Sequence, residues 1–561
     1  MSGSSSLPVA QVFQRWRLGG FGVHHGSFSS YWESYLLRDP AMTGLSMCVE
    51  LVFGGDRYVR LTFGPRDVTT TSGVTGEEVT FQPFGADEPS VAFTMAIGSA
   101  SAQTRRLRIR FPAEHLAPNA LGRMGRPLAG WGEVSLNYDG GDHDERIVLL
   151  RGDMVDGVTA GRDEGGDFVE CSLADPKDAV DLWMPPYVVD SDTFGGADDR
   201  AMGARYPVVL SSFANIPALP VDTANDRFLA CLGHGWTIDD VKVNGASYSS
   251  GDAVFGWSAL ETVDGQGTAV TLIAFSGSHT WDYSESVHVS VSGDVTCSDL
   301  IGAIRYVVEG FSGLGPWGTS RALFAQAAAR LSAFPVAAVV NGSGAGSATR
   351  ALSYVESGLL QGLPMVSMVW DRGGYGPVVV DRRAAPVMEL VQGAGHLVGR
   401  AESWRETAKD QASNRIAVRY SYNAVTNVFA GVTLRDASNS DLCRLSMQWA
   451  GPRDREPVEL IQIDDETAAA YVSDWILVHE TLPSVDVVYP CNPALLLLLR
   501  RGDNVSLTDD DFGWSDLEAT VVGFEYARPV SAITLRVWNS YYELGGAAGA
   551  VRYIPEGVSP Q

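Results

Sequence analysis

Histidines, serines and clustered carboxylates are the residues of this sequence that could perform chemistry, and their spacing decides whether they do. Nine histidines occur, but none stands in the paired spacing of a helical metal site. The neighbours His24 and His25 would point to opposite faces of a strand. Gly342 to Ser347 superficially matches the Gly-x-Ser-x-Gly turn of a hydrolase nucleophile, but Gly344 stands where the serine must be, so we interpret it as a loop.

Acidic residues cluster at three places without the spacing of a known site. The clusters are Asp142 with Asp144 and Glu145, Asp464 to Glu466, and Asp509 to Asp511. The third offers oxygen ligands suited to calcium but lacks the glycine and final glutamate of an EF-hand loop, which favours a solvated turn. No glycine-rich cofactor loop follows a strand. We therefore predict no catalytic residue, no cofactor-binding residue and no metal ligand, and hence no enzyme.

The tripeptide Arg-Gly-Asp occurs twice, at Arg151 to Asp153 and at Arg501 to Asp503. Each follows an apolar run, so we interpret both as turns that end a strand rather than as adhesion motifs. The repetition also hints at two related barrels.

Composition indicates a multidomain, β-rich protein. The chain has 561 residues, of which 45% are hydrophobic, 19% are charged and 61 are glycine. The net charge of −26 argues against nucleic-acid binding, because phosphate contacts need lysine and arginine. The one compact basic run, Arg105, Arg106, Arg108 and Arg110, alternates with Leu107 and Ile109, which predicts a strand with one apolar face and one solvated or interface face.

The cysteine spacing and the lengths of the hydrophobic runs indicate the cellular compartment in which the protein is made. Six cysteines lie far apart in the sequence and form no zinc or redox spacing, so we expect buried free thiols, with distant disulfides left open. Residues 1–6 do not begin a signal peptide. The longest aliphatic run, Leu495 to Leu499, is far shorter than the roughly 20 residues of a membrane span. We expect synthesis in the cytoplasm and no membrane span.

Turn residues and hydrophobic periodicity predict a mainly β fold with a smaller α+β part. Its division into two antiparallel β-barrels or sandwiches plus inserted small domains is what the family resemblance described below implies. Helices are expected at 298–310, 319–332, 354–360 and 465–479, the last with an acidic N-terminus that suits the helix dipole. The expected units are an N-terminal β-rich region with a possible arm (1–95), a first β-barrel (96–190), a β-rich inserted domain (191–295), a small α+β domain (296–400), a second β-barrel with one helix (401–545) and a C-terminal tail (546–561).

Three passages, in this order, resemble the central tail hub, or baseplate hub, proteins of tailed bacteriophages. The first is a strand pair at 129–150 that leads into Arg151 to Gly157. The second is Arg205 to Val209, with 215–219 and the hairpin at 238–245. The third is Asn414 to Tyr420, with the later Arg501 to Thr508. The resemblance covers roughly residues 100 to 540, and residues 1–95 match no family that we can name.

The resemblance implies a homotrimeric structural protein of the virion tail, made in the host cytoplasm. Two hub barrels per subunit would give a pseudo-sixfold ring that joins the tail tube or distal-tail ring to the tip and its fibres. DNA or the tape-measure protein would pass through the lumen, which the acidic composition would keep from binding DNA. A distal-tail or fibre-attachment protein, and a β-sandwich carbohydrate-binding or carbohydrate-active protein, remain the alternatives.

Overall fold

The structure, a computed structural model, describes residues 44–538 apart from short internal gaps. The gaps are 54–56, 116–129, 165, 294–296, 298, 316–317, 332–333, 341–348, 373, 383, 394–395, 408–410 and 424–425. The predicted arm at 1–40, the loop at 342–347 and the tail at 546–561 lie outside the described residues.

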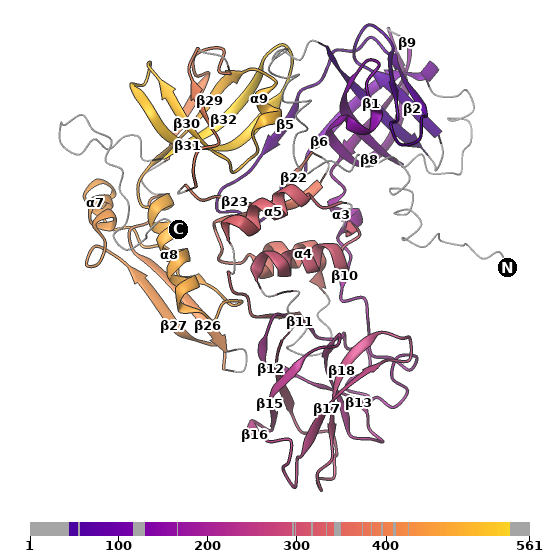
Figure 1. The fold of residues 1–561 in the computed structure, drawn as a ribbon, viewed down its shortest axis with the longest axis vertical. Coiled ribbons are helices and arrows are strands. Elements are labelled where there is room, and N and C mark those ends of the chain that lie inside the picture. Colours follow the sequence, from indigo (N-terminus) through magenta and orange to yellow (C-terminus); the bar gives the residue numbers. More distant parts are fainter. Residues whose placement is uncertain are drawn as a thin grey trace, which may run out of the picture.

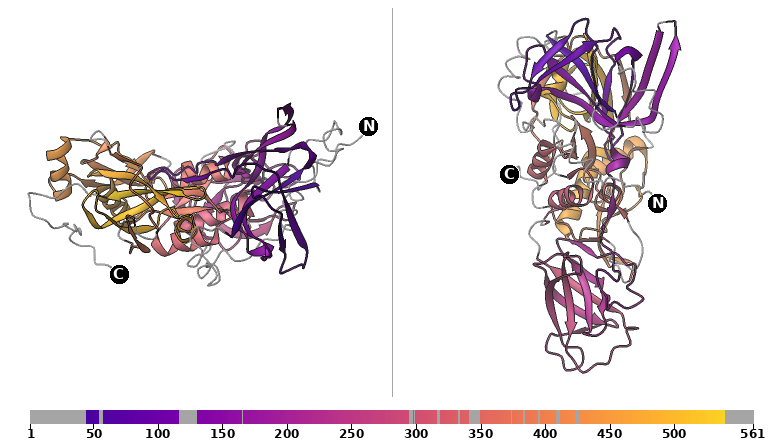
Figure 2. Two further views of the ribbon diagram at one scale, coloured as in Figure 1. Left: turned by 90° about the horizontal axis from the view of Figure 1, so that it is seen from above. Right: turned by 90° about the vertical axis from the view of Figure 1, so that its right-hand side faces the viewer.

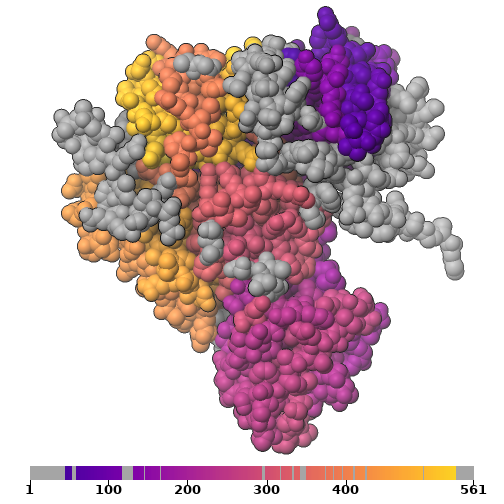
Figure 3. Space-filling view, viewed as in Figure 1, coloured from indigo at the N-terminus to yellow at the C-terminus, as the bar shows by residue number. Residues whose placement is uncertain are grey.

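The fold is mainly β with a smaller helical part, as predicted (Figure 1). Two large sheets lie side by side at one end of the molecule, and a layer that contains α4 and α5 lies beneath them. A β-sandwich forms a separate lobe at the far end (Figure 3). A small unit of three strands and two helices lies at the side.

The first sheet unit is an eight-stranded sheet in the order β3-β4-β2-β1-β7-β8-β9-β6. Buried residues alternate along β6, as at Leu107, Ile109 and Phe111. The boundary predicted at residue 95 is not observed, because β1 pairs along its whole length with β7. That pairing is long-range, so local patterns could not reveal it. The strands are β1 (Leu45–Phe53), β2 (Arg57–Thr62), β3 (Val68–Thr71), β4 (Glu78–Pro83), β6 (Arg106–Pro112), β7 (Gly130–Tyr138), β8 (Ile147–Asp163) and β9 (Gly166–Ala174).

Strand β8 corrects one prediction. Two short strands with a turn at Arg151 to Asp153 were expected, but the chain runs on as one strand of 17 residues. Gly152 lies inside it, where a Cβ would collide with the carbonyl of Ala174. A bulge follows this tripeptide, between Val155 and Val158. Beyond it the β8–β9 hairpin stands out from the sheet (Figure 2).

The range 191–295, predicted as a β-rich inserted domain, contains the strands of a β-sandwich at 213–292. Two four-stranded sheets, β12-β19-β15-β16 and β13-β14-β18-β17, pack around Phe228, Ile273 and Val289. The chain reaches it through α3 (Lys177–Val180), β10 (Trp183–Met184) and β11 (Val208–Leu210). The sandwich strands are β12 (Phe213–Pro217), β13 (Leu219–Asp222), β14 (Arg227–Leu232), β15 (Thr237–Val243), β16 (Ala246–Tyr248), β17 (Trp257–Val263), β18 (Ala269–Phe275) and β19 (Val287–Ser292).

The central layer contains three of the four predicted helices. Helix α4 (Leu300–Phe311) begins where Asp299 accepts a hydrogen bond from Gly302 N at 2.7 Å, as expected of an N-cap. Helix α5 (Arg321–Arg330) begins after Ser320, and α6 (Ala351–Tyr354) continues as a π-turn (Val355–Leu359). The strands of this layer are β20 (Ala338–Val340), β21 (Thr349–Arg350), β22 (Val366–Asp371) and β23 (Gly374–Val379).

The region predicted as a second barrel with one helix divides into two units. The first is a three-stranded sheet, β27-β26-β28, formed by β26 (Ile416–Asn423), β27 (Val428–Arg435) and β28 (Val458–Glu459). It carries α7 (Asp441–Ala450) and α8 (Glu466–Glu480). Helix α8 was predicted, and α7 was missed although Ser440 caps it and Gly451 ends it. The expectation of one helix was therefore wrong.

The second sheet unit has the order β24-β30-β31-β32-β29-β25. It recruits β5 (Val91–Thr94) from the N-terminal part of the chain, which pairs with β31. The aliphatic run at Leu495 is the short helix α9 (Leu495–Leu498). The strands are β24 (Met388–Val391), β25 (Ser403–Glu406), β29 (Ser484–Cys491), β30 (Asn504–Asp509), β31 (Trp514–Tyr526) and β32 (Ser531–Trp538). Among the helices of the described ranges, none is long and apolar enough to cross a membrane.

A buried ion cluster holds β7 to β8 in the first sheet unit. Glu133 accepts hydrogen bonds from Arg146 Nε at 2.5 Å and Arg151 Nε at 2.8 Å, and its side chain is 2% exposed. Burial opposes ionisation of Glu133, yet the two guanidinium groups lower its pKa to about 2.

We predict that Glu133→Gln destabilises the protein by about 3–5 kcal/mol at pH 7, because two buried arginines lose their counter-charge. A carboxyl with a lowered folded pKa contributes stability above its ordinary pKa, and that stability is lost as the pH falls toward 2. Urea unfolding at pH 7 and pH 3 should therefore show a smaller difference between variant and wild type at pH 3.

Glu170→Gln is the matched control, since Glu170 pairs with the mostly exposed Arg108 and should cost less than about 1 kcal/mol. Equal effects of the two substitutions at pH 7 would contradict the interpretation.

Candidate assembly site

The two sheet units contain the same four-stranded arrangement. In the first, three consecutive strands, β7, β8 and β9, form a meander. Strand β6, which comes before β7 in the sequence, pairs with the last strand of the meander, β9. In the second, β30-β31-β32-β29 repeats that order, and all neighbouring pairs in both are antiparallel. Each repeat also has register shifts in its first and second pairings. The fold therefore holds two topologically equivalent elements.

The two units share one hydrophobic core. Buried side chains from the first, such as Val134 and Leu173, belong to the same continuous cluster as Val487, Val521 and Leu535 of the second. A core that runs through both units resists hinge motion, because separating them would expose its apolar surface to water. The pair is one packed body.

Strand β5 fixes how the units sit against each other. It precedes β6 of the first unit in sequence but pairs antiparallel with β31 of the second, with Phe93 opposite Phe524. The pairing continues into Met95, whose N–H donates to the carbonyl of Val522 at 2.9 Å.

Two arginines lie against the ring of Phe93, one from each unit. The Cζ of Arg105 lies 5.0 Å from the ring centre and the Cζ of Arg501 lies 6.0 Å from it. Arg105 donates from Nε and Nη2 to Asp175 at 2.9 and 2.6 Å and from Nη1 to the carbonyl of Leu149 at 2.8 Å. Its guanidinium is thus anchored within the first unit.

Arg501 connects the second unit to the rest of the molecule. It is 3% exposed and donates to the carbonyls of Thr94, at 2.9 Å, and Trp370. The Asp371 carboxylate lies 3.5 Å from its Nη2. Burial lowers the pKa of Arg501 to about 10 although Asp371 favours its charge, so the group remains protonated at neutral pH.

Gly502 and Asp503, which complete the second Arg-Gly-Asp tripeptide, contact the helical layer. Gly502 has φ +83° and faces Val378, where a side chain would collide. Asp503 accepts a hydrogen bond from Gln326 Nε2 at 2.6 Å, and Arg330 donates to the Gly502 carbonyl at 2.8 Å. The tripeptide therefore forms a turn, as predicted, although the element before it is helix α9 rather than a strand.

The two Arg-Gly-Asp tripeptides are not equivalent in the fold. Arg151 lies within β8 and pairs with Glu133, whereas Arg501 precedes β30. Burial raises the pKa of Asp153 to about 6. The repeated tripeptide suggested two related units, and related four-strand arrangements exist, but the tripeptide does not mark them.

Glu356 joins the first unit to the helical layer. This buried carboxylate, in the π-turn after α6, accepts from Lys177 Nζ at 2.6 Å, Ser101 Oγ at 2.8 Å and the Tyr375 hydroxyl at 2.9 Å. The carboxylate therefore ties together four segments that are distant in sequence. No motif marked it, because a single glutamate in a helical pattern has no local signature.

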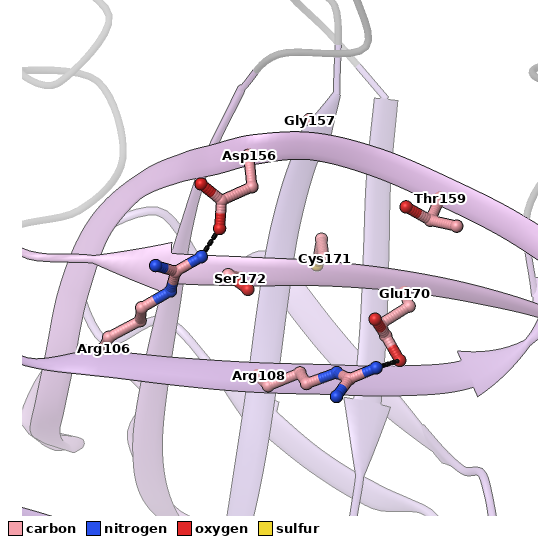
Figure 4. Close-up of a pocket in the computed structure, with 8 residues that line it drawn as sticks. All are labelled: Arg106, Arg108, Asp156, Gly157, Thr159, Glu170, Cys171 and Ser172. Carbon is pink, nitrogen blue, oxygen red and sulfur yellow. Dashed lines mark ion pairs between the residues drawn. The ribbon is translucent and has the colours of Figure 1, made fainter.

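The arginine strand lies where its alternation predicted. Arg106, Arg108 and Arg110 line the outer face of β6 and pair with Asp156, Glu170 and Asp163 of β8 and β9. A pocket of ≈ 470 Å³ is lined by two of these pairs, Arg106 with Asp156 and Arg108 with Glu170 (Figure 4). Its arginines point toward those acids, and burial raises the pKa of its Cys171 thiol to about 12, so the thiol is not activated as a nucleophile.

The other candidate residues have structural roles. Asp509 is buried and accepts from the Tyr489 hydroxyl and from Asp511 N at 2.8 Å, so it is not the solvated carboxylate that we expected. Asp142 and Asp465 cap helices. All six cysteines are buried free thiols, as predicted. Within the described ranges, no three histidine, cysteine or acidic side chains form a group that could hold a metal ion.

We predict that Arg501→Met lowers the free energy of unfolding by about 3 kcal/mol or more, because the Asp371 carboxylate loses a buried partner and two carbonyls lose their donor. Amide exchange in β5 should accelerate in the same variant. Arg400→Met, which removes an ion pair at a side chain 84% exposed, should cost less than about 1 kcal/mol. An Arg501 variant as stable as the Arg400 variant would contradict the role of the junction.

No protein-family model and no curated protein matches the sequence. The structure aligns with a tail protein from Neisseria meningitidis over 88% of this chain and 97% of the other, at 9% identity and a TM-score of 0.37. It aligns with the 43 kDa tail protein of a Shewanella oneidensis prophage over 88% and 98%, at 11% identity and a TM-score of 0.37.

A prophage tail protein from Listeria monocytogenes aligns over 84% of this chain and 94% of the other, at 10% identity and a TM-score of 0.32. These identities and TM-scores are too low to transfer an activity or a partner. All three of these solved structures are described as tail proteins, two of them from prophages.

Proposed function

We propose that this chain is a non-enzymatic hub protein of a phage or phage-like tail. Three copies would form a ring that joins the tail tube or distal-tail ring to the tip and its fibres. The observation that carries the proposal is the pair of equivalent four-stranded arrangements within one packed body. Three such pairs present six similar elements, which suits a junction between a threefold tip and a sixfold tube.

The chemistry of the described residues supports a structural role. Buried charged side chains at and beside the junction of the sheet units are held by specific partners, as Arg105 is by Asp175 and Asp503 is by Gln326. Catalytic groups need a site where a substrate can reach them. The junction instead uses its charges to join segments, which suits a component that transmits force between the tube and the tip.

The proposal predicts position and copy number in the particle. Cryo-EM of purified tails, with imposed and then relaxed symmetry, should show three copies between the tube and the tip, with both sheet units of each copy in one ring. Six copies would instead indicate a distal-tail protein, and absence from the tail would overturn the proposal. The acidic composition further predicts a negative lumen that does not bind DNA, and a basic lumen would contradict this part.

A further inference from the structure

The outer face of the β26–β28 sheet carries a row of exposed apolar side chains. Exposed and half-buried residues alternate along β27, so that four alternate positions face outward. Val428, Val432 and Leu434 are 58%, 54% and 53% exposed. The fourth, Ala430, is exposed as well. Among the described strands, β27 alone places four apolar residues at successive outward positions toward solvent.

The opposite face of β27 packs against other residues of the same chain. Phe429 packs against Tyr422 with ring centres 5.0 Å apart, and Tyr420 lies over Gly431. Arg435 donates to Asp474 of α8 at 2.8 Å. Because a strand turns alternate residues to opposite faces, these contacts prevent the apolar row from turning inward.

The strand also ends its sheet. In the order β27-β26-β28, β27 pairs with β26 alone among the described strands. Exposed edge strands usually carry charges that block pairing with other chains. The outward side chains of β27 carry none, and the one charged residue of this strand, Arg435, faces inward. An apolar row on an unblocked edge indicates a surface that a partner covers.

Charge favours a second copy of this chain as that partner. Two molecules of net charge −26 repel each other, so copies meet most easily where each surface is neutral. On the outer face of this sheet, the charged strand residues Arg419 and Glu459 pair with each other at 3.1 Å. The face is therefore both apolar and locally neutral.

We propose that this outer face of β26–β28, centred on Val432, is the surface through which one copy of the chain contacts the next. The inference rests on the proposed function, since it names a contact that would hold the copies of the hub together. Burying the valines and the leucine would remove apolar side chains from water, which stabilises association.

The test uses the purified full-length chain and measures its mass distribution by mass photometry over a concentration series. Val432→Glu adds a carboxylate opposite Arg419, whose charge Glu459 already balances, so the contact gains net negative charge and association should weaken roughly 100-fold. Its thermal unfolding should be unchanged in conditions where both proteins are monomeric, because the position is exposed. Val263→Glu is the matched control, since Val263 is 55% exposed at the end of β17 in the sandwich, and it should associate like the wild type.

The possible outcomes separate this inference from the proposed function. A wild-type trimer that Val432→Glu dissociates supports both. A wild-type dimer that it dissociates supports the contact and contradicts the trimeric hub. An assembly that Val432→Glu leaves intact, or a wild type that stays monomeric throughout the series, overturns the contact. In those cases the position of the chain in the tail still decides the proposed function.

A photo-crosslinking amino acid in place of Val432 provides an independent readout. Crosslinks in the purified protein should yield a product of twice the chain mass, and mass spectrometry of that product identifies the receiving surface. Crosslinks in whole tails that reach another tail protein and never a second copy would overturn the proposal.

Discussion

A guanidinium group removed from water must find acceptors for its N–H donors in the protein, and this requirement organises the junction of the two sheet units. Arg501 meets it through its two terminal amino groups, on which the carbonyls of Thr94 and Trp370 and the carboxylate of Asp371 converge, whereas its buried Nε has no hydrogen-bond partner among the described residues. These groups belong to β5 and β22, so the contacts that solvate the charge also fix three parts of the fold. The lowered pKa of Arg501 reflects the cost of its burial.

The same principle recurs at the other joints. Arg105 is held by Asp175 and a carbonyl, and Glu356 is held by donors from segments far apart in sequence. Burying any of these groups alone would cost free energy. The cost is offset only when all of its hydrogen-bond and ion-pair partners are in place. Such joints specify one arrangement of the units, while the continuous apolar core supplies the stabilisation. The result is a pair of sheet units that are packed as one body.

On the surface, charged side chains form ion pairs that are exposed to solvent. The outer arginines of β6 pair with acids of β8 and β9, and Arg419 pairs with Glu459 beside the apolar row of β27. A chain with a large acidic excess thus contains faces where its charge is cancelled locally. Those faces are where copies or neighbours of the same sign can approach, which links the strongly acidic composition to assembly.

The sequence by itself determined the local elements. Alternation placed β6 with its apolar side inward and Arg106, Arg108 and Arg110 outward. An N-cap placed α4 and an acidic N-terminus placed α8, because these signals depend on neighbours only a few residues away. The resemblance to tail hubs rested on the order of such elements. Helix α7 was predictable too, since Ser440 and Gly451 bound an amphipathic run.

Only the tertiary structure decided which strands share a sheet. The pairing of β1 with β7 and of β5 with β31, and the convergence on Arg501, join residues separated by up to hundreds of positions. No local pattern encodes such contacts. The second Arg-Gly-Asp forms a turn whereas the first continues as strand, because Gly152 is held between neighbouring strands while Gly502 is free to adopt a positive φ. The same three residues take the conformation that their distant neighbours impose.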